Sequence, residues 1–266
     1  MKNLFLQIIA LSVISLSGCS KIDLAGVYAT KYRDVPAAFS GIEIHGSMDV
    51  AMSDDVSAAE ITADSNVLPY IEIEVKDNAL HIRYSENAKF SSNVLGTVIT
   101  VPYSGNLSSI RISDGAFLNV GCRLDRSVKI ESRSGSGLYC DRISSDDLTL
   151  SLYDGSSFSA GHVGISSASL VMTGGSSVRM DGTISYCKAI FEDGSSLGPK
   201  YDEAGLQIGD FDCNMRDGSS AVFASDGTIS GIMRDGSSIS CITGRNVDYS
   251  SLVVYGHSVI SVYTRP

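Results

Sequence analysis

Five aspartates recur at one position of a repeated motif, and their spacing could support chemistry. Asp-Gly-Ser-Ser occurs at 154–157, 193–196, 217–220 and 235–238, and 114–115 is a shorter copy. Carboxylates and hydroxyls repeated in one register could bind Ca²⁺, which prefers oxygen ligands. Two carboxylates at a set separation could instead cleave a glycosidic bond. The aspartates concerned are Asp114, Asp154, Asp193, Asp217 and Asp235.

Arginines next to this acidic ladder argue against a bound cation. Arg216 and Arg234 directly precede Asp217 and Asp235. The G-G-x-G-x-D pattern of calcium-binding β-rolls is also absent. We therefore predict that the aspartates act mainly as turn residues and that no cofactor is bound. A calcium site at Asp193, Asp217 and Asp235 stays open as an alternative.

The motif belongs to a repeat of about 20 residues, which must position it. The aligned glycines are separated by 20, 20, 20, 19, 24, 18 and 20 residues. A fixed period of this length is typical of a solenoid, in which each coil stacks on the next. Glu192 then lies one coil from Arg216, and we expect the two to pair. The glycines are Gly115, Gly135, Gly155, Gly175, Gly194, Gly218, Gly236 and Gly256.

Apolar residues flank each glycine with a period of two. The third residue after it is apolar in every copy, and the third before it is apolar in all copies but one. This pattern indicates short strands with one buried face on either side of a corner. A coil of this length is too short for a strand-helix-strand unit, which needs about 30 residues. Glycine at the corner supplies a positive φ. We predict an all-β, right-handed parallel β-helix.

The start of the chain has the features of an export signal, residues 1–18. Lys2 precedes an apolar run that is too short to cross a bilayer. The run ends in Leu-Ser-Gly-Cys, which resembles a bacterial lipobox and implies cleavage before Cys19 and lipidation of its thiol. Ser20, rather than Asp, follows the cysteine, which favours an outer-membrane lipoprotein. Residues 19–32 would form a lipidated stalk.

The remaining chain divides into a cap at 33–106 and the solenoid at 107–266. Alternating apolar residues predict a strand-turn-strand over 39–52 and a hairpin over 71–84. Such strands could cover the open edge of the solenoid, which would otherwise invite aggregation. The long spacing before Gly218 marks an insertion, and we expect a binding loop at 199–211.

The composition argues against several functions. The net charge is −10 and no basic stripe occurs, which disfavours nucleic-acid binding. The sequence contains no G-x-S-x-G, no H-E-x-x-H and no phosphate loop, and its four histidines are scattered. Five cysteines follow Cys19, so at least one is unpaired within the chain. Cys140, Cys213 and Cys241 stand at apolar positions of the repeat and are predicted to be buried.

Three motifs precede the repeats. They are Phe39-x-Gly-Ile-Glu-Ile-x-Gly-Ser-Met-Asp-Val50, Leu68-Pro69-Tyr70-Ile71 and Leu80-x-Ile82, and Gly-Ser corners follow about every 20 residues. This order resembles the head GIN domain family, a domain-of-unknown-function group named as auto-transporter adhesins and frequent among Bacteroidota lipoproteins. The resemblance covers about residues 35–264. It implies a β-helical fold and an adhesin role, and it supplies no catalytic residue.

These observations favour a non-enzymatic cell-envelope lipoprotein that is tethered to the outer membrane through Cys19. Its ligand would be a glycan or a protein of the envelope or host, bound at the Ser/Asp ridge or at the 199–211 loop. The alternative is a β-helix carbohydrate-active enzyme that uses the acidic ladder for polysaccharide cleavage.

Overall fold

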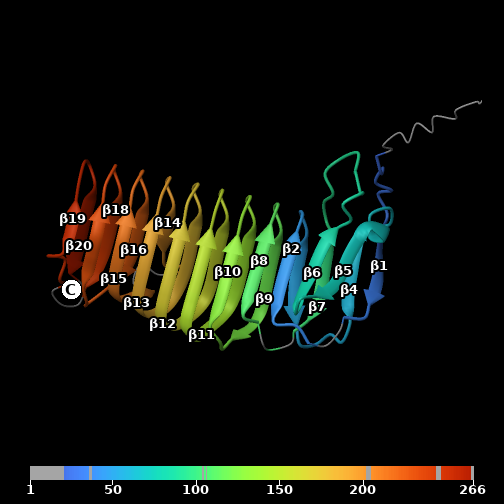
Figure 1. Cartoon of the computed structure of the whole chain (residues 1–266), viewed down its shortest axis with the longest axis horizontal. Coiled ribbons are helices and arrows are strands. Elements are labelled where there is room, and N and C mark those ends of the chain that lie inside the picture. Colours follow the sequence, from blue (N-terminus) through green and yellow to red (C-terminus); the bar gives the residue numbers. More distant parts are fainter. Residues whose placement is uncertain are drawn as a thin grey trace, which may run out of the picture.

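A computed structural model of the chain describes residues 21–35, 38–103, 105, 107–201, 205–243 and 247–264. These residues form a β-solenoid whose coils follow one another along one long axis (Figure 1). Strands of successive coils pair in parallel with a register of about 20 residues, so the predicted parallel β-solenoid is confirmed. Within these ranges the only helix is the short 3₁₀ turn η1 (Leu68–Tyr70), and none has the length and hydropathy that a membrane crossing requires.

Two long sheets run the length of the solenoid. The post-corner sheet contains the strand that follows each glycine corner, and its order in space is β1, β4, β7, β3, β9, β11, β12, β13, β14, β16, β18, β20. The pre-corner sheet contains the strand that leads to the next corner, in the order β5, β6, β2, β8, β10, β11, β12, β13, β15, β17, β19. The strand bounds are β1 Tyr28–Arg33, β2 Gly41–His45, β3 Asp49–Ser53, β4 Ala59–Asp64, β5 Ile71–Lys76, β6 Ala79–Tyr84, β7 Val98–Pro102, β8 Ser109–Ser113, β9 Phe117–Leu124, β10 Val128–Ser132, β11 Gly137–Leu152, β12 Ser157–Met172, β13 Ser177–Phe191, β14 Ser196–Gly198, β15 Leu206–Met215, β16 Ser220–Ala224, β17 Ile229–Met233, β18 Ser238–Thr243, β19 Leu252–Val254 and β20 Val259–Thr264.

A short middle sheet lies between these two sheets in the central coils. Strands β11, β12 and β13 are long enough to bend through all three sheets, and the register of the middle sheet places Ile165, Ile184 and Ile208 in one row. After Ile208 the next coil contributes a single paired residue, Ala224, opposite Gln207. The middle sheet therefore stops at the start of β15, and the following coil has lost its middle strand.

The first seven of the eight predicted corners contain two consecutive residues in the left-handed region of the backbone map, and the last has only Gly256 there. At one corner Asp154 has a φ of 55° and Gly155 a φ of 74°, and the other Asp-Gly corners are similar. Glycine adopts this conformation at no steric cost, and aspartate is one of the few other residues that tolerate it. The sequence analysis assigned a positive φ to the glycine alone. The structure shows that the aspartate shares it, which gives the repeated Asp a conformational role.

The serine after each glycine is buried and completes the corner. Ser156 is 0% exposed, and its hydroxyl donates a hydrogen bond to the carbonyl oxygen of Tyr153 at 2.6 Å. Between coils, the N–H of Gly155 donates to the carbonyl oxygen of Gly174 at 2.8 Å. The polar atoms of the motif are thus used within the stack. The same serine bond recurs at Ser136, Ser176, Ser195, Ser219 and Ser237.

The core is a continuous column of the apolar residues that flank the corners. Seven successive residues at the third position after the glycine are buried, as the alternation predicted. They are Leu118, Leu138, Phe158, Val178, Leu197, Ala221 and Ile239. The eighth, Val259, is 54% exposed because the last coil is shifted by one residue from the predicted alignment: Val259 pairs with exposed Ser238, and Ile260 takes the register of Ile239. Cys140, Cys213 and Cys241 are buried as predicted, and all five cysteines after Cys19 are free thiols.

The N-terminal part differs from the prediction in two respects. Strands β2 and β3, assigned to the cap, lie within the stack, parallel to β8 and β9. Strands β6 and β7 come later in the sequence but lie outside β2 and β3. Residues 28–32, expected in a stalk, belong to β1, which pairs antiparallel with β4. The predicted hairpin over 71–84 is confirmed as β5 and β6.

Asp64 ties the start of the described chain to this cap. Its carboxylate accepts hydrogen bonds from the backbone N–H groups of Ala25, Gly26 and Asn66 at 3.0, 2.7 and 2.9 Å. Burial by itself would raise the pKa of this carboxyl, but the three donors outweigh it and hold the pKa below its ordinary value of 3.8. The segment that was expected to be a stalk is therefore held against β4 by a charged group.

Candidate functional site

The three aspartates of the calcium alternative lie at successive corners. Arg216 donates to both Asp217 and Glu192, at 2.5 and 2.7 Å, so the predicted pairing between neighbouring coils is confirmed. Arg234 lies 3.8 Å from Asp235. The side chains of Asp217 and Asp235 are 37% and 59% exposed, and exposed ion pairs of this kind contribute about 0–1 kcal/mol. The acidic ladder is therefore built from turn residues whose charges face water and arginine.

A metal site would need several ligands that converge on one point. Over the part of the chain that the structure describes, no group of three or more His, Cys, Asp or Glu side chains is arranged to hold an ion. Asp193, Asp217 and Asp235 thus belong to no such group. Their carbonyl oxygens instead accept the N–H of the corner glycine in the preceding coil, at 2.8, 2.8 and 2.9 Å.

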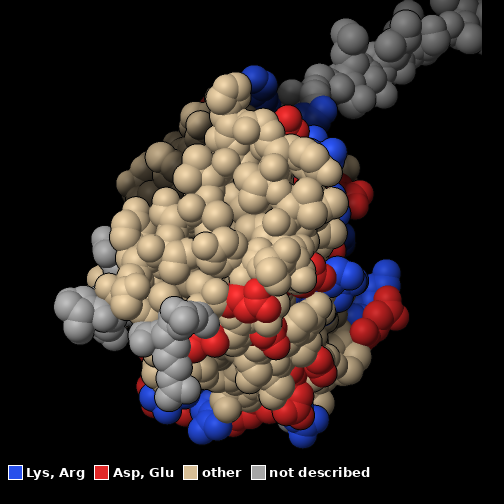
Figure 2. Space-filling view, turned by 90° about the vertical axis from the view of Figure 1, so that its left-hand side faces the viewer, with Lys and Arg blue, Asp and Glu red and all other residues tan. Residues whose placement is uncertain are grey.

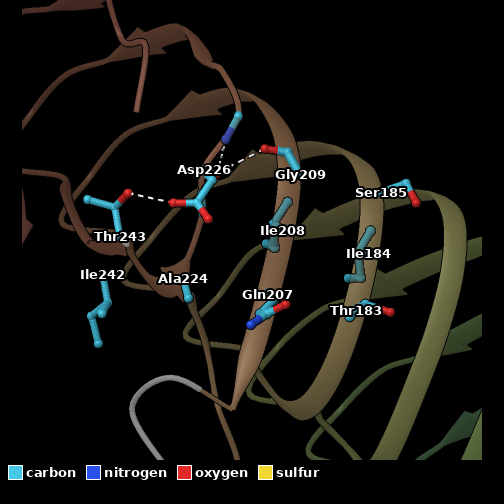
Figure 3. A pocket seen from close by; sticks show the side chains of 12 residues that line it. Thr183, Ile184, Ser185, Gln207, Ile208, Gly209, Ala224, Asp226, Ile242 and Thr243 are labelled. Atoms are coloured by element: carbon cyan, nitrogen blue, oxygen red, sulfur yellow. Dashed lines mark hydrogen bonds between the residues drawn. The ribbon is translucent and has the colours of Figure 1, made fainter. Parts of the chain in front are cut away.

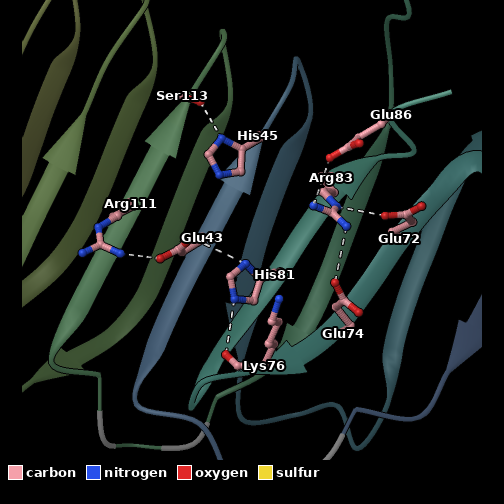
Figure 4. A network of polar contacts seen from close by, with 10 residues as sticks. All are labelled: Glu43, His45, Glu72, Glu74, Lys76, His81, Arg83, Glu86, Arg111 and Ser113. Carbon is pink, nitrogen blue, oxygen red and sulfur yellow. Dashed lines mark hydrogen bonds and ion pairs between the residues drawn. The ribbon is translucent and has the colours of Figure 1, made fainter. Parts of the chain in front are cut away.

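A network of charged side chains covers the pre-corner sheet near the N-terminal end (Figure 4). Glu43 lies between Arg111 and His81, with N–O distances of 2.5 and 3.5 Å. Arg83 pairs with Glu72 at 2.8 Å. This hydrogen bond lowers the pKa of the Glu72 carboxyl and raises that of the Arg83 guanidinium. Each of these carboxylates already faces a cation, so the network stabilises neighbouring strands rather than presenting an acid and a base.

A serine and a histidine meet at the edge of the same network. His45 Nδ1 lies 2.8 Å from Ser113 Oγ, and that hydroxyl lies 2.7 Å from Asp114 Oδ2. In a hydrolytic triad the histidine must stand between the serine and the acid so that it can accept the serine proton and be stabilised. Here the serine stands between the other two. The arrangement is a surface hydrogen-bond chain, with the connectivity of a triad missing.

The pocket that best fits a ligand lies where the middle sheet stops (Figure 3). It has a volume of about 470 Å³. Its walls come from β13, β15, the turn after β16 and the end of β18. The lining residues are Thr183, Ile184, Ser185, Gln207, Ile208, Gly209, Ala224, Ser225, Asp226, Gly227, Ile242 and Thr243.

The shortened coil between Gly218 and Gly236 creates this pocket. The chain crosses from one long sheet to the other through the tight turn 225–228 instead of a middle strand. Ser225 Oγ donates to the carbonyl oxygen of Gly209 at 2.9 Å and accepts the N–H of Gly227 at 3.1 Å. A Cβ on Gly227 would lie 2.2 Å from the Gly209 oxygen, so glycine is required for this approach. The turn thus packs against β15 at one point and leaves the rest of that edge open.

The pocket is polar but almost uncharged. Hydroxyl groups of Thr183 and Ser185 and the amide of Gln207 stand on exposed positions of β13 and β15. Asp226 contributes the one charge among the lining residues, and its Oδ1 accepts a hydrogen bond from Thr243 Oγ1 at 2.8 Å. Hydroxyls, an amide and a carboxylate around a partly apolar floor can bind a ligand that carries many hydroxyl groups.

The insertion ends at this pocket. Residues 206–211, which were predicted to belong to a loop, are the first part of strand β15, so that prediction is wrong for its second half. At the start of the insertion, Lys200 Nζ lies 4.2 Å from the ring centre of Tyr139 and 4.8 Å from that of Tyr201. The backbone N–H of Lys200 donates to Asp181.

One feature of these sites, the contact between Glu43 and His81, had no signal in the sequence. Glu43 and His81 stand 38 positions apart and meet only because β2 and β6 pair in parallel. The pocket did have a signal, namely a coil of 24 residues followed by one of 18. The sequence analysis noted the long coil and gave the short one no role, yet the short coil removes the strand that would fill the pocket.

Comparison with known proteins agrees with the fold. The sequence matches the family described as "Putative auto-transporter adhesin, head GIN domain" over residues 38–243, which is most of the chain. The chain belongs to this family. A comparison with functionally curated proteins finds no match.

Three solved structures of similar fold come from Parabacteroides species. A "putative adhesin" from Parabacteroides merdae has a TM-score of 0.79 at 15% identity, covering 91% of this chain and 98% of that one. A "putative adhesin" from Parabacteroides distasonis has a TM-score of 0.76 at 18% identity, covering 92% and 100%. A "putative lipid binding protein" from Parabacteroides distasonis has a TM-score of 0.75 at 14% identity, covering 91% and 99%. At these identities the likeness extends to the fold alone.

Cys19, the predicted lipid-attachment residue, and the predicted signal at 1–18 lie outside the described residues. The predicted anchor is therefore a matter for experiment.

Proposed function

We propose that this protein is a non-enzymatic adhesin of the bacterial cell envelope that binds a neutral glycan in the pocket beside β15. The observation that carries the proposal is the interruption of the middle sheet, which opens a pocket lined by Thr183, Ser185 and Gln207. The chain would be held at the outer membrane by a lipid on Cys19, for which the Leu-Ser-Gly-Cys motif is the support.

The lining favours a saccharide without charge. Sugar hydroxyls both donate and accept hydrogen bonds, and the side chains of Ser, Thr, Gln and Asp offer both kinds of partner. Among the described lining residues Asp226 is the one carboxylate, and its Oδ1 accepts a hydrogen bond from Thr243. An anionic sugar would be disfavoured by the net charge of the chain, which is −10.

The same lining argues against polysaccharide cleavage in this pocket. Glycoside hydrolysis requires two carboxyl groups on opposite sides of the scissile bond, and the lining residues that the structure describes supply one. The acidic ladder, which the enzyme alternative invoked, consists of corner residues with positive φ. A binding role does not require Asp226 or the corner aspartates to change their protonation states.

A titration with neutral oligosaccharides, followed by calorimetry or NMR, tests the binding proposal. Gln207→Ala and Asp226→Asn should each weaken binding about tenfold, which corresponds to about 1.4 kcal/mol for one lost polar contact. Thr149→Ala is the matched control because Thr149 is exposed on the pre-corner sheet, away from the lining. Equal binding by all three variants would place the ligand elsewhere. Turnover of a polysaccharide that Asp226→Asn abolishes would favour the enzyme instead.

The anchor is tested separately from the pocket. Cys19→Ser should abolish incorporation of a fatty-acid label and release the protein from the membrane fraction, while glycan binding stays unchanged. Retention of the variant in membranes would remove the lipid from the proposal and leave the pocket untouched.

A further inference from the structure

The two ends of the solenoid are built differently. At the N-terminal end the outermost strands are β1 and β5, which each pair on one side only. Both carry charges along their length: Lys31 and Arg33 in β1, and Glu72, Glu74 and Lys76 in β5. Charged side chains on an edge strand oppose the addition of another strand. This end is therefore protected against strand addition.

The C-terminal end lacks that protection. Within the described residues, β19 pairs only with β17 and β20 only with β18, so one edge of each is open. Their sequences, Leu-Val-Val and Val-Ile-Ser-Val-Tyr-Thr, contain no charged residue. Val254, Val259 and Tyr263 are 40%, 54% and 57% exposed. An uncharged open edge with exposed apolar side chains is a template for another strand.

The end-on view agrees with this description. Figure 2 looks at the C-terminal end and shows a broad uncharged surface over its upper part, with acidic and basic side chains over the lower part and the right-hand margin. Over residues 247–264 the sequence has one charged side chain, Asp248, in a chain of net charge −10. Two copies of the chain repel each other over most of their surfaces, and this end is where they can approach without that cost.

We propose that the C-terminal ends of two copies dock and form a closed, end-to-end dimer. A two-fold axis perpendicular to the strands and to the solenoid axis would place β20 antiparallel to β20 of the second copy. The same rotation would place β19 antiparallel to β19 of the second copy. Both open edges are then filled at once, and the apolar interiors of the two solenoids become continuous.

The geometry also limits the size and strength of the assembly. Each copy uses its C-terminal end once, and its charged N-terminal edges remain unpaired, so growth stops at two chains. The edge strands contain 3 and 6 residues per copy, fewer than the 20–30 residues per side of a standard interface, so we expect a Kd in the micromolar range.

One consequence rests on the proposed function. The described chain begins at one end of the solenoid and β20 lies at the other (Figure 1). If the lipid on Cys19 holds the N-terminal end, a C-terminal dimer directs the two anchors away from each other. Such a dimer would join two membranes, and the partner of this adhesin would be a second copy on a facing surface.

Sedimentation of residues 21–266, which contain every strand, tests the dimer without the anchor. The wild-type chain should show a monomer–dimer equilibrium, and its scattering should give a maximum dimension close to twice that of the monomer. Val262→Lys should weaken dimerisation about 100-fold, because the two-fold axis brings two lysines into an apolar interface. Val262 is 37% exposed and stands in register with buried Cys241, so the thermal stability of the variant is measured beside that of the wild type to separate lost docking from lost folding. Val27→Lys, at 62% exposure near the opposite end, is the matched control and should leave the equilibrium unchanged.

Three results would overturn the dimer: a wild-type chain that stays monomeric up to millimolar concentration, an unchanged equilibrium in Val262→Lys, or a dimer no longer than the monomer. If the wild-type chain stays monomeric, the C-terminal end would remain free to bind a different partner. Clustering of vesicles that carry the lipidated chain tests whether the dimer joins two membranes. If the chain dimerises in solution but the vesicles do not cluster, end-to-end docking stands and homophilic adhesion fails.

Discussion

Replacing one corner serine by alanine should measure how much the buried hydroxyls of the repeat stabilise the solenoid. In Ser156→Ala the lost group is a hydroxyl that is 0% exposed and 2.6 Å from the Tyr153 carbonyl oxygen. A hydrogen bond of this kind contributes about 0.5–1.5 kcal/mol net. The Tyr153 oxygen still accepts the N–H of residue 156 at 3.2 Å, so it is not left unsatisfied. We therefore expect a loss of about 1 kcal/mol.

The neighbouring residue supplies the control. Ser157 belongs to the same corner but is exposed, so Ser157→Ala should change the free energy of unfolding by less than about 0.5 kcal/mol. Equilibrium urea unfolding, followed by circular dichroism, gives both values. For a chain of this size a loss of about 1 kcal/mol corresponds to a Tm lower by about 2–4 °C. A double variant with Ser219→Ala, three coils away, should show additive losses.

The reasoning fails if Ser156→Ala and Ser157→Ala have the same small effect. That result would mean that the buried hydroxyl gains no more from the Tyr153 carbonyl than it gained from water. A change in the slope of the urea transition for Ser156→Ala alone would point to partial unfolding of the coils, in which case the two free energies could not be compared.

Three further predictions concern single residues. Gly231→Ala should destabilise the chain by about 3 kcal/mol or more, because the added Cβ would lie 1.9 Å from the Cys213 oxygen. In Gly218→Ala the added Cβ meets no atom within 4 Å, so that variant should lose only about 1–2 kcal/mol through backbone strain. Equal losses of the two variants in urea unfolding would contradict this. Because the folded protein lowers the pKa of Asp64, the stabilising effect of this carboxylate is complete above its ordinary pKa of 3.8 and disappears as the pH falls through the lower folded pKa. Amide exchange in the N-terminal segment of the wild type should therefore accelerate at acid pH. In Asp64→Ala it should already be fast at pH 7. Burial raises the pKa of the partly exposed Cys122 thiol, so this thiol should react slowly with a thiol reagent at pH 8. The four buried thiols should react only after the chain unfolds. Rapid reaction of more than one thiol in the folded chain would show that the apolar core is accessible to solvent.

Much of the solenoid could be predicted because its information is local and repeated. The repeat position that Leu138 occupies is apolar in every coil, and equivalent positions must stack if each coil pairs with the next. The corner was predicted as well, although the positive φ of the aspartates was not. Asp-Gly is compatible with one or two left-handed residues, and only the backbone geometry distinguishes them.

The candidate site was predicted less well, for a physical reason. The insertion at 199–211 directed attention to the correct part of the chain, but its second half is a strand and the pocket depends on the next coil. Whether 18 residues close a coil by tightening a bend or by omitting a strand depends on backbone contacts such as that between Gly209 and Gly227. These two residues belong to different coils, and Gly209 in turn approaches Ser185 of the coil before it, where an added Cβ would lie 2.4 Å from the Ser185 oxygen. Contacts of this kind join residues that are far apart in the sequence.

The sequence by itself determined the stacking of like residues, the turn chemistry of the corners and the alternation that buries one face of each strand. These properties follow from the period and the local conformational preferences of the chain. The tertiary structure alone decided that β6 and β7 lie outside β2 and β3, that the middle sheet stops at β15, and that the C-terminal edges are open while the N-terminal edges are charged. Each of these depends on which distant strands pair, and a strand carries the same alternating pattern whichever neighbour it has.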